Sequence, residues 1–247
     1  FSKIGADPNG HFLRRELSRA GVDVSHVRES VDETTPFTFV GIHPGGDRSF
    51  IHTPGTNLSF SIRDLALESL FQCKALFYQD LWVLPKLDGP SAPMILAEAH
   101  RRGVLTLLDE CYGLGPNREV FEAALPHCDV VLPSCDDMRV IYPGLDPVQV
   151  AGRLRSLGAK RVILKLGRDG CLVSNEKGDT RLPSLATEIV DCTGAGDCFD
   201  AGFAAGVVNG LDDLAAAKLG SAAAAACIRN VGGAVGIPHY KTLQSIL

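Results

Sequence analysis

Basic stripes, long apolar runs and paired metal-binding motifs are all missing from this sequence. Its 24 basic residues are outnumbered by 29 acidic ones, giving a formal charge of −5 with only 6% aromatic residues. This composition argues against nucleic acid as a partner. No apolar run approaches the length of a membrane span, so we expect no membrane partner either. The first residues do not have the pattern of a secretory signal peptide.

The eight cysteines also lack the spacing of a metal or redox motif. No C-x-x-C pair and no paired histidine spacing occurs among them. The pattern supports neither a zinc site nor a redox motif. Most of the cysteines lie in apolar surroundings, where a free thiol behaves as a small hydrophobic group. This usage favours a reducing cytoplasm, so we expect a cytoplasmic protein.

The sequence does contain the alternating strand and helix patterns of an α/β protein. With 247 residues, 45% of them hydrophobic, it fits one large domain better than two small ones. Continuous Val/Leu runs predict strands at 75–80, 104–109 and 128–132, with a helix at 92–102. Such strands are buried on both faces and predict a mostly parallel sheet between helical layers. Sites in these sheets lie beyond the carboxyl ends of strands, which makes pocket candidates of Gln79, Asp80, Asp109 and Glu110.

The most informative stretch is the small-residue segment 191–197, Asp-Cys-Thr-Gly-Ala-Gly-Asp. A β-prone segment, 187–190, precedes it and an Ala-rich apolar helix follows it, so the glycines are expected in a strand-to-helix turn. The first amides of a helix lack intrahelical partners and attract anions. A carboxylate in the same turn, Asp197, suits a base that removes a proton from a group attacking phosphate. The alternative interpretation is a tight turn with an Asp cap.

The whole run resembles a known motif. It matches D-T-x-G-A-G-D-x-F-x-x-G of the ribokinase/phosphofructokinase-B family of carbohydrate kinases, with Cys192 in place of Thr. No G-x-x-x-x-G-K-[ST] occurs, so the chain is not a P-loop enzyme. The resemblance implies a ribokinase-like three-layer sandwich with a small β lid. It also implies an ATP-dependent sugar kinase in which Asp197 is the catalytic base and Gly194, Ala195 and Gly196 form the anion hole.

Further motifs of the family point to the residues that bind the nucleotide. Residues 165–170, Lys-Leu-Gly-Arg-Asp-Gly, resemble the family's K-L-G-x-x-G turn along the nucleotide. Ser221 stands where an Asn often precedes the alanine run at the adenine pocket. The resemblance therefore implies nucleotide-binding roles for Lys165, Gly167 and Ser221.

The resemblance to the family also implies two cation sites. Ser134 and Asp137 occupy the place of the family's N-x-x-E, whose carboxylate organises Mg²⁺ and its waters. Mg²⁺ keeps several waters and tolerates an outer-sphere carboxylate, so Asp137 is expected to act through water; Ser134 is also a candidate helix N-cap. Asp191, with the C-terminal segment 231–238, is expected to frame a monovalent-cation site, with K⁺ as a candidate cofactor beside ATP and Mg²⁺.

The substrate side is expected around a hairpin. Two β-prone runs, 37–43 and 48–52, flank a turn at 44–47. By resemblance they form a lid at about 28–58 that covers the sugar and provides a homodimer contact. Asn57 stands in the place of the family's G-A-N, and with Gln79 and Asp80 it is a candidate for binding sugar hydroxyls. Lone histidines in strands are more often structural, so His43 and His52 receive no catalytic role.

The N-terminal part departs most from the family. A helix is predicted with Asp7 as N-cap, Pro8 in its first turn, and Phe12, Leu13 and Leu17 at core spacing. The family's first strand, glycine-rich turn and sugar-binding acidic residue have no counterpart before it. We therefore expect the natural protein to carry additional N-terminal residues, with residues 1–247 forming one kinase domain.

Three functions remain open on these grounds. The first is an ATP-dependent kinase acting on a sugar or keto-sugar acid, with ATP and a small sugar as partners. The alternatives are a nucleoside or vitamin kinase of the same superfamily and a nucleotide-binding regulatory protein that has lost catalysis. Retention of Asp197 argues against the last.

Overall fold

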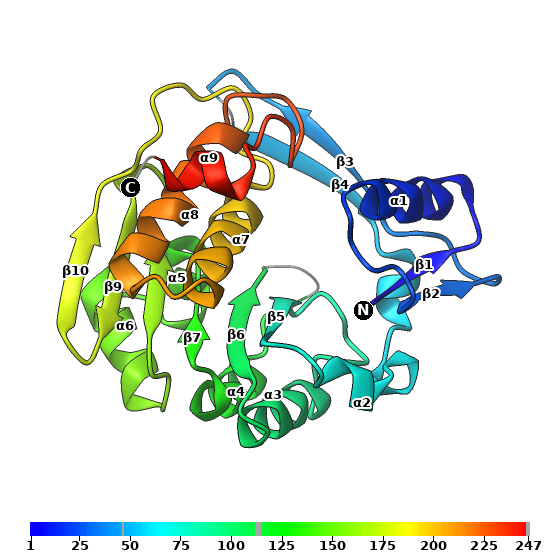
Figure 1. Ribbon diagram of the computed structural model, residues 1–247, viewed down its shortest axis with the longest axis horizontal. Coiled ribbons are helices and arrows are strands. Elements are labelled where there is room, and N and C mark those ends of the chain that lie inside the picture. Colours follow the sequence, from blue (N-terminus) through cyan, green and yellow to red (C-terminus); the bar gives the residue numbers. More distant parts are fainter. Residues whose placement is uncertain (46, 112–114, 246–247) are drawn as a thin grey trace.

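The computed structural model describes residues 1–45, 47–111 and 115–245, and its centre is a six-stranded sheet (Figure 1). The strand order is β10-β9-β8-β7-β6-β5. Neighbouring strands are parallel from β5 to β8, while β8, β9 and β10 pair antiparallel at one edge. The prediction of a mostly parallel sheet is confirmed. The strands are β5 (Ala75–Leu81), β6 (Leu105–Glu110), β7 (Val130–Val131), β8 (Val162–Lys165), β9 (Cys171–Asn175) and β10 (Gly178–Leu182).

Helices cover both faces of this sheet, because successive strand residues point to opposite sides. In β6, Leu108 packs into one buried cluster and Leu107 into another. The first cluster includes α3 (Ser91–Arg101), α4 (Arg118–Ala124), α5 (Cys135–Ile141) and α6 (Pro147–Ser156). The second includes α7 (Ala195–Val208) and α8 (Asp213–Cys227). This arrangement is the predicted three-layer sandwich.

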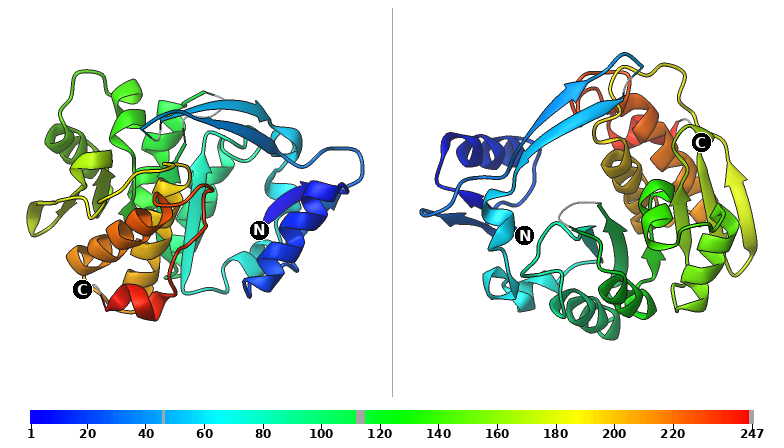
Figure 2. Two further views of the ribbon diagram at one scale, coloured as in Figure 1. Left: turned by 90° about the horizontal axis from the view of Figure 1, so that it is seen from above. Right: turned by 180° about the vertical axis from the view of Figure 1, so that it is seen from behind.

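The N-terminal residues form a separate small unit. Strands β1 (Ser2–Gly5) and β2 (Val27–Ser30) pair in parallel, joined by α1 (Pro8–Arg19). The predicted hairpin is confirmed as β3 (Phe37–Ile42) and β4 (Arg48–Thr53), although Gly46 of its turn lies outside the described residues. The hairpin extends from this unit toward the C-terminal helices (Figures 1 and 2). The short helices α2 (Leu67–Leu70) and α9 (Tyr240–Gln244) complete the fold.

Two local predictions need correction. Asp7 caps α1 and Pro8 opens it as predicted, but Phe12, Leu13 and Leu17 are 51%, 41% and 36% exposed. The helix instead approaches its small sheet through Gly10, where an added Cβ would lie 2.2 Å from the Gly5 carbonyl oxygen. The helix contacts the small sheet through its backbone, so the side chains of Phe12, Leu13 and Leu17 stay exposed to solvent.

The segment Thr187–Val190 is the second correction, because it is not a strand. The N–H groups of Val190 and Asp191 donate to the carbonyl oxygen of Ile228, just after α8. The segment therefore pairs with a helix end, and the turn at 191–194 is entered from a loop. Within the described parts of the chain, no helix is long and apolar enough to cross a membrane.

Candidate active site

The turn before α7 requires glycine at its last position. Gly194 has φ of +74°, and a Cβ there would lie 2.2 Å from the carbonyl oxygen of Gly233. In the first turn of α7, Ala195 donates to Cys192 and Cys198 donates to Gly194. The N–H groups of Gly196 and Asp197 have no acceptor among the residues that the structure describes. Helix N-terminal donors of this kind favour an anion.

Asp191 stabilises this turn by hydrogen bonds. It is buried, and its carboxylate accepts hydrogen bonds from the Thr193 N–H at 2.9 Å, the Thr193 hydroxyl at 2.6 Å and the Gly232 N–H at 2.9 Å. Burial opposes ionisation, but these hydrogen bonds outweigh it and lower the pKa of Asp191. The carboxylate thereby joins the turn to the loop after α8.

Tertiary folding brings the end of β5 to Asp197. The Gln79 side-chain amide donates to the Asp197 carboxylate, which is exposed in the first turn of α7. Asp80 and Trp82 follow with positive φ values of 58° and 86°. The buried Asp88 carboxylate holds this unusual backbone by accepting from the Trp82 and Leu84 N–H groups. Non-glycine residues in this conformation cost energy and cluster at functional sites.

Asn57 lies apart from this group. It occupies the 3₁₀ turn Gly55–Leu58 at the base of the hairpin, where its side chain is partly buried. The described structure joins it to neither Gln79 nor Asp80 by a hydrogen bond. The predicted sugar contacts thus lie on two different elements.

Asp80 gives a prediction for pH dependence. Burial, followed by the nearby charges of Asp197 and Asp109, raises the pKa of Asp80 to about 6 from 3.8. The folded state therefore holds this proton more tightly than the unfolded state, so its contribution to stability is full below about pH 4 and is lost as pH rises through 6. Asp80→Asn, which tolerates positive φ, should unfold at a higher temperature than the parent at pH 7.5 and at a similar temperature at pH 4. Equal differences at the two pH values, measured by thermal unfolding, would contradict the assignment.

The nucleotide-side candidates lie just after β8 and within α8. Gly167 begins a 3₁₀ turn, Gly167–Asp169, between β8 and β9. Ser221 is buried within α8 and is 8% exposed. Ser134 caps α5 by accepting from the Asp137 N–H at 3.0 Å, and its hydroxyl donates to the Asp137 carboxylate at 2.7 Å. Burial raises the pKa of Asp137. The N-cap interpretation of Ser134 is thus confirmed.

A buried cluster of charged side chains lies next to the turn before α7. Lys165 donates to Asp109 at 2.9 Å and to Asp200 at 2.8 Å. Sequence reasoning singled out Lys165 and Asp109 but missed Asp200. The signal was present as the i, i+3 spacing of Asp197 and Asp200, which places them one helical turn apart.

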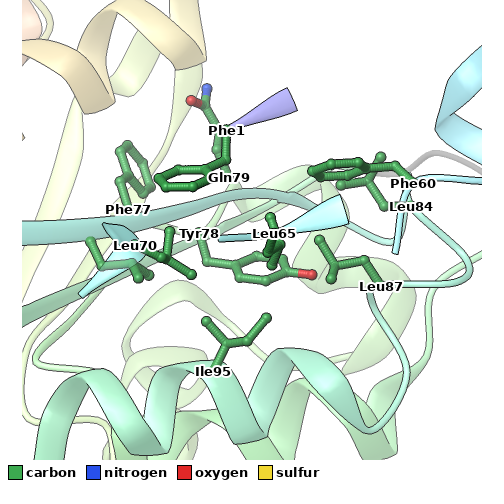
Figure 3. A pocket seen from close by; sticks show the side chains of 11 residues that line it. Phe1, Phe60, Leu65, Leu70, Phe77, Tyr78, Gln79, Leu84, Leu87 and Ile95 are labelled. Carbon is green, nitrogen blue, oxygen red and sulfur yellow. The ribbon is translucent and has the colours of Figure 1, made fainter. Parts of the chain in front are cut away.

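A cavity of about 110 Å³ lies beside β5 but has a different character (Figure 3). Its lining is mainly apolar, and the amide end of Gln79 points away from the apolar side chains. Few polar groups face the space, whereas a sugar or phosphate needs several. The turn before α7 is therefore the stronger candidate for the active site.

The fold and the turn are those expected of an α/β phosphotransferase, with N–H groups at the N-terminus of α7 beside the carboxylate of Asp197. The profile of the pfkB family carbohydrate kinases matches residues 1–239. The chain belongs to this family of ATP-dependent phosphotransferases with an alcohol group as acceptor. The family expected from the motif is thereby confirmed.

Individual relatives agree with this placement. The chain is 30% identical to an ATP-dependent 6-phosphofructokinase of Thermoanaerobacterium thermosaccharolyticum, over 99% of this chain and 77% of the relative. The structure of Arabidopsis thaliana ribokinase complexed with ribose and ATP matches with a TM-score of 0.81 and 25% identity, over 99% of this chain and 80% of the other. A putative ribokinase II of E. coli, in complex with ATP and Mg²⁺, matches in fold with a TM-score of 0.84 and 22% identity, over 99% and 81%.

Proposed function

We propose that this chain transfers the γ-phosphate of MgATP to a hydroxyl of a small sugar or sugar acid at the turn before α7. The observation that carries the proposal is the juxtaposition of Asp197 with the N–H groups of Gly196 and Asp197, facing Gln79 at the end of β5. A base and an anion cradle within one helical turn match the needs of phosphoryl transfer.

The proposed roles follow from these positions. Asp197 takes the proton of the attacking hydroxyl as its oxygen forms a bond to the γ-phosphorus and ADP leaves. The N–H groups of Gly194, Gly196 and Asp197 are proposed to stabilise negative charge on the transferring group, whereas the Ala195 N–H already donates to the Cys192 carbonyl oxygen. Gln79, Asp80 and Asn57 are proposed to bind acceptor hydroxyls. Gly167 is proposed to allow close approach of the nucleotide, and Ser221 to support the adenine side.

Mg²⁺ is proposed to arrive with ATP. The described residues contain no cluster of three metal-ligating side chains, which fits a cation held largely by phosphates and waters. Asp137, partly buried beside Ser134, is the proposed water-mediated ligand. When bound, the cation would neutralise charge on the phosphates.

This role for Asp137 predicts a metal-dependent defect. Asp137→Ala should raise the Mg²⁺ concentration needed for half-maximal activity by about 10-fold, the scale reported for weakened outer-shell ligation. The measurement is a Mg²⁺ titration at saturating ATP. Asp136→Ala, an exposed neighbour on the same helix, is the control. Superimposable titrations of parent and Asp137→Ala would leave Asp137 as part of a helix cap only.

Two further proposals concern assembly and a second cation. Phe37, Phe39 and Ile51 share one face of the hairpin and are exposed, which favours the hairpin as a homodimer contact. Asp191 is proposed to border a K⁺ site. The three hydrogen bonds that its carboxylate accepts also give it a structural role in the turn.

A panel of acceptors tests the proposed function. ADP release would be measured with sugars, sugar phosphates, keto-sugar acids and nucleosides, each with MgATP. Turnover of a sugar or sugar acid supports the proposal. Preference for a nucleoside supports the alternative kinase. ATP binding without turnover of any acceptor supports the regulatory alternative and contradicts the proposal.

A further inference from the structure

The end of β8 carries a lysine whose ammonium group is enclosed by the protein. Lys165 Nζ lies 2.9 Å from Asp109 Oδ1, at the end of β6, and 2.8 Å from Asp200 Oδ2, in α7. The exposed fractions of these side chains are 13%, 7% and 0%. One cation thus joins two strands of the sheet to the helix that follows the anion turn.

The surroundings keep this cation charged. Burial alone would lower the pKa of Lys165, but Asp200, Asp109 and Glu110 outweigh it and raise the pKa. Burial raises the pKa of Asp200 and of Glu110, against the opposing effect of Lys165. Asp200 Oδ1 and Glu110 Oε2 are buried without a hydrogen-bond partner in the described structure. Asp109 and Asp200 share the Lys165 ammonium as their cation, whereas Glu110 accepts a hydrogen bond from the Ser134 N–H at 3.0 Å.

The cluster borders the residues proposed to act on phosphate. Asp200 is one helical turn beyond Asp197, and a Cβ at Gly196 would lie 3.7 Å from Lys165 Nζ. The N-cap of α7 is Gly194, which has no side-chain cap. The contact between Lys165 and Asp200 adds a side-chain anchor one turn into α7, beside the bonds that Asp191 and Cys198 Sγ make to the loop after α8.

We propose that Lys165 is a positioning residue, which acts through Asp200 to hold the N-terminal end of α7 against the ends of β6 and β8. On this account Lys165 fixes Asp197 and the free amides relative to β5, and it does not bind the nucleotide directly. The inference rests on the proposed function for its catalytic readout, but the anchoring itself can be measured without activity.

The first test separates positioning from nucleotide binding by kinetics. Lys165→Met keeps the length of the side chain and removes its charge; kcat should fall at least about 10-fold while KM for ATP changes less than about 3-fold. Lys165→Arg should recover part of kcat because it keeps the charge. Lys160→Met, which removes the lysine of the exposed Lys160–Asp129 pair, should behave like the parent. A rise of 10-fold or more in KM for ATP with kcat preserved would overturn the proposal, as would parental kinetics in Lys165→Met.

The second test uses hydrogen exchange in the absence of substrate. Amides of residues 198–201, hydrogen-bonded in α7, should exchange at least about 10-fold faster in Lys165→Met, while those of α8 keep the parental rates. Should Lys165→Met fail to fold, Lys165→Met/Asp200→Asn removes one of the two carboxylates left without a cation and should show the same local acceleration. Unchanged exchange at 198–201, or equal acceleration in α8, would overturn the proposal. If no acceptor is phosphorylated, the proposed function fails, whereas exchange still decides the anchoring role.

Discussion

Asp197→Asn is expected to lower kcat by about 10²–10⁴-fold, the usual contribution of a general base. The amide keeps the shape of the side chain but cannot accept the proton of the attacking hydroxyl. The side chain is exposed in the first turn of α7, so folding should be unaffected. ATP affinity should stay close to that of the parent, because the backbone amides of the turn remain in place.

Steady-state kinetics with the acceptor identified by the panel, together with calorimetric titration of MgATP, measures both quantities. Asp179→Asn, on the exposed edge strand β10, is the matched control for loss of one carboxylate. Full turnover by Asp197→Asn would show that another group accepts the proton.

Gly194→Ala is expected to abolish most activity and to destabilise the protein by about 2–5 kcal/mol, combining a left-handed backbone with steric overlap. The added methyl group would meet the Gly233 carbonyl oxygen at 2.2 Å, so either the turn or the loop after α8 must move. Movement of the turn would displace the amides that are proposed to bind phosphate.

The matched control for this substitution is Gly210→Ala at the other end of α7. Gly210 has φ of +85°, but nothing lies within 4 Å of an added Cβ. It should lose only about 1–2 kcal/mol from the backbone conformation and keep its kcat. Thermal unfolding and kinetics of both variants test the comparison. Equal losses in the two would mean that contact with Gly233 is unimportant.

The sequence alone determined the local features of this protein. Continuous Val/Leu runs predicted three strands of the central sheet, because a strand buried on both faces is apolar along its whole length. The turn of small residues at 194–196 predicted a helix N-terminus with free amides, and Asp197 predicted a base beside it. The hairpin followed equally from two β-prone runs around a turn. These features depend on neighbours within a few residues, which is why a single sequence shows them.

Only the tertiary structure decided which distant side chains meet. Lys165 contacts Asp109 and Asp200, 56 and 35 residues away, because strand order places β8 near β6 and packs α7 over both. The same principle explains the wrong expectations. Phe12 on α1 had core spacing but no layer to cover it, and Thr187–Val190 was β-prone but lay beside a helix end. Periodicity shows which residues seek burial or pairing, whereas the packing of distant elements decides whether a partner is there.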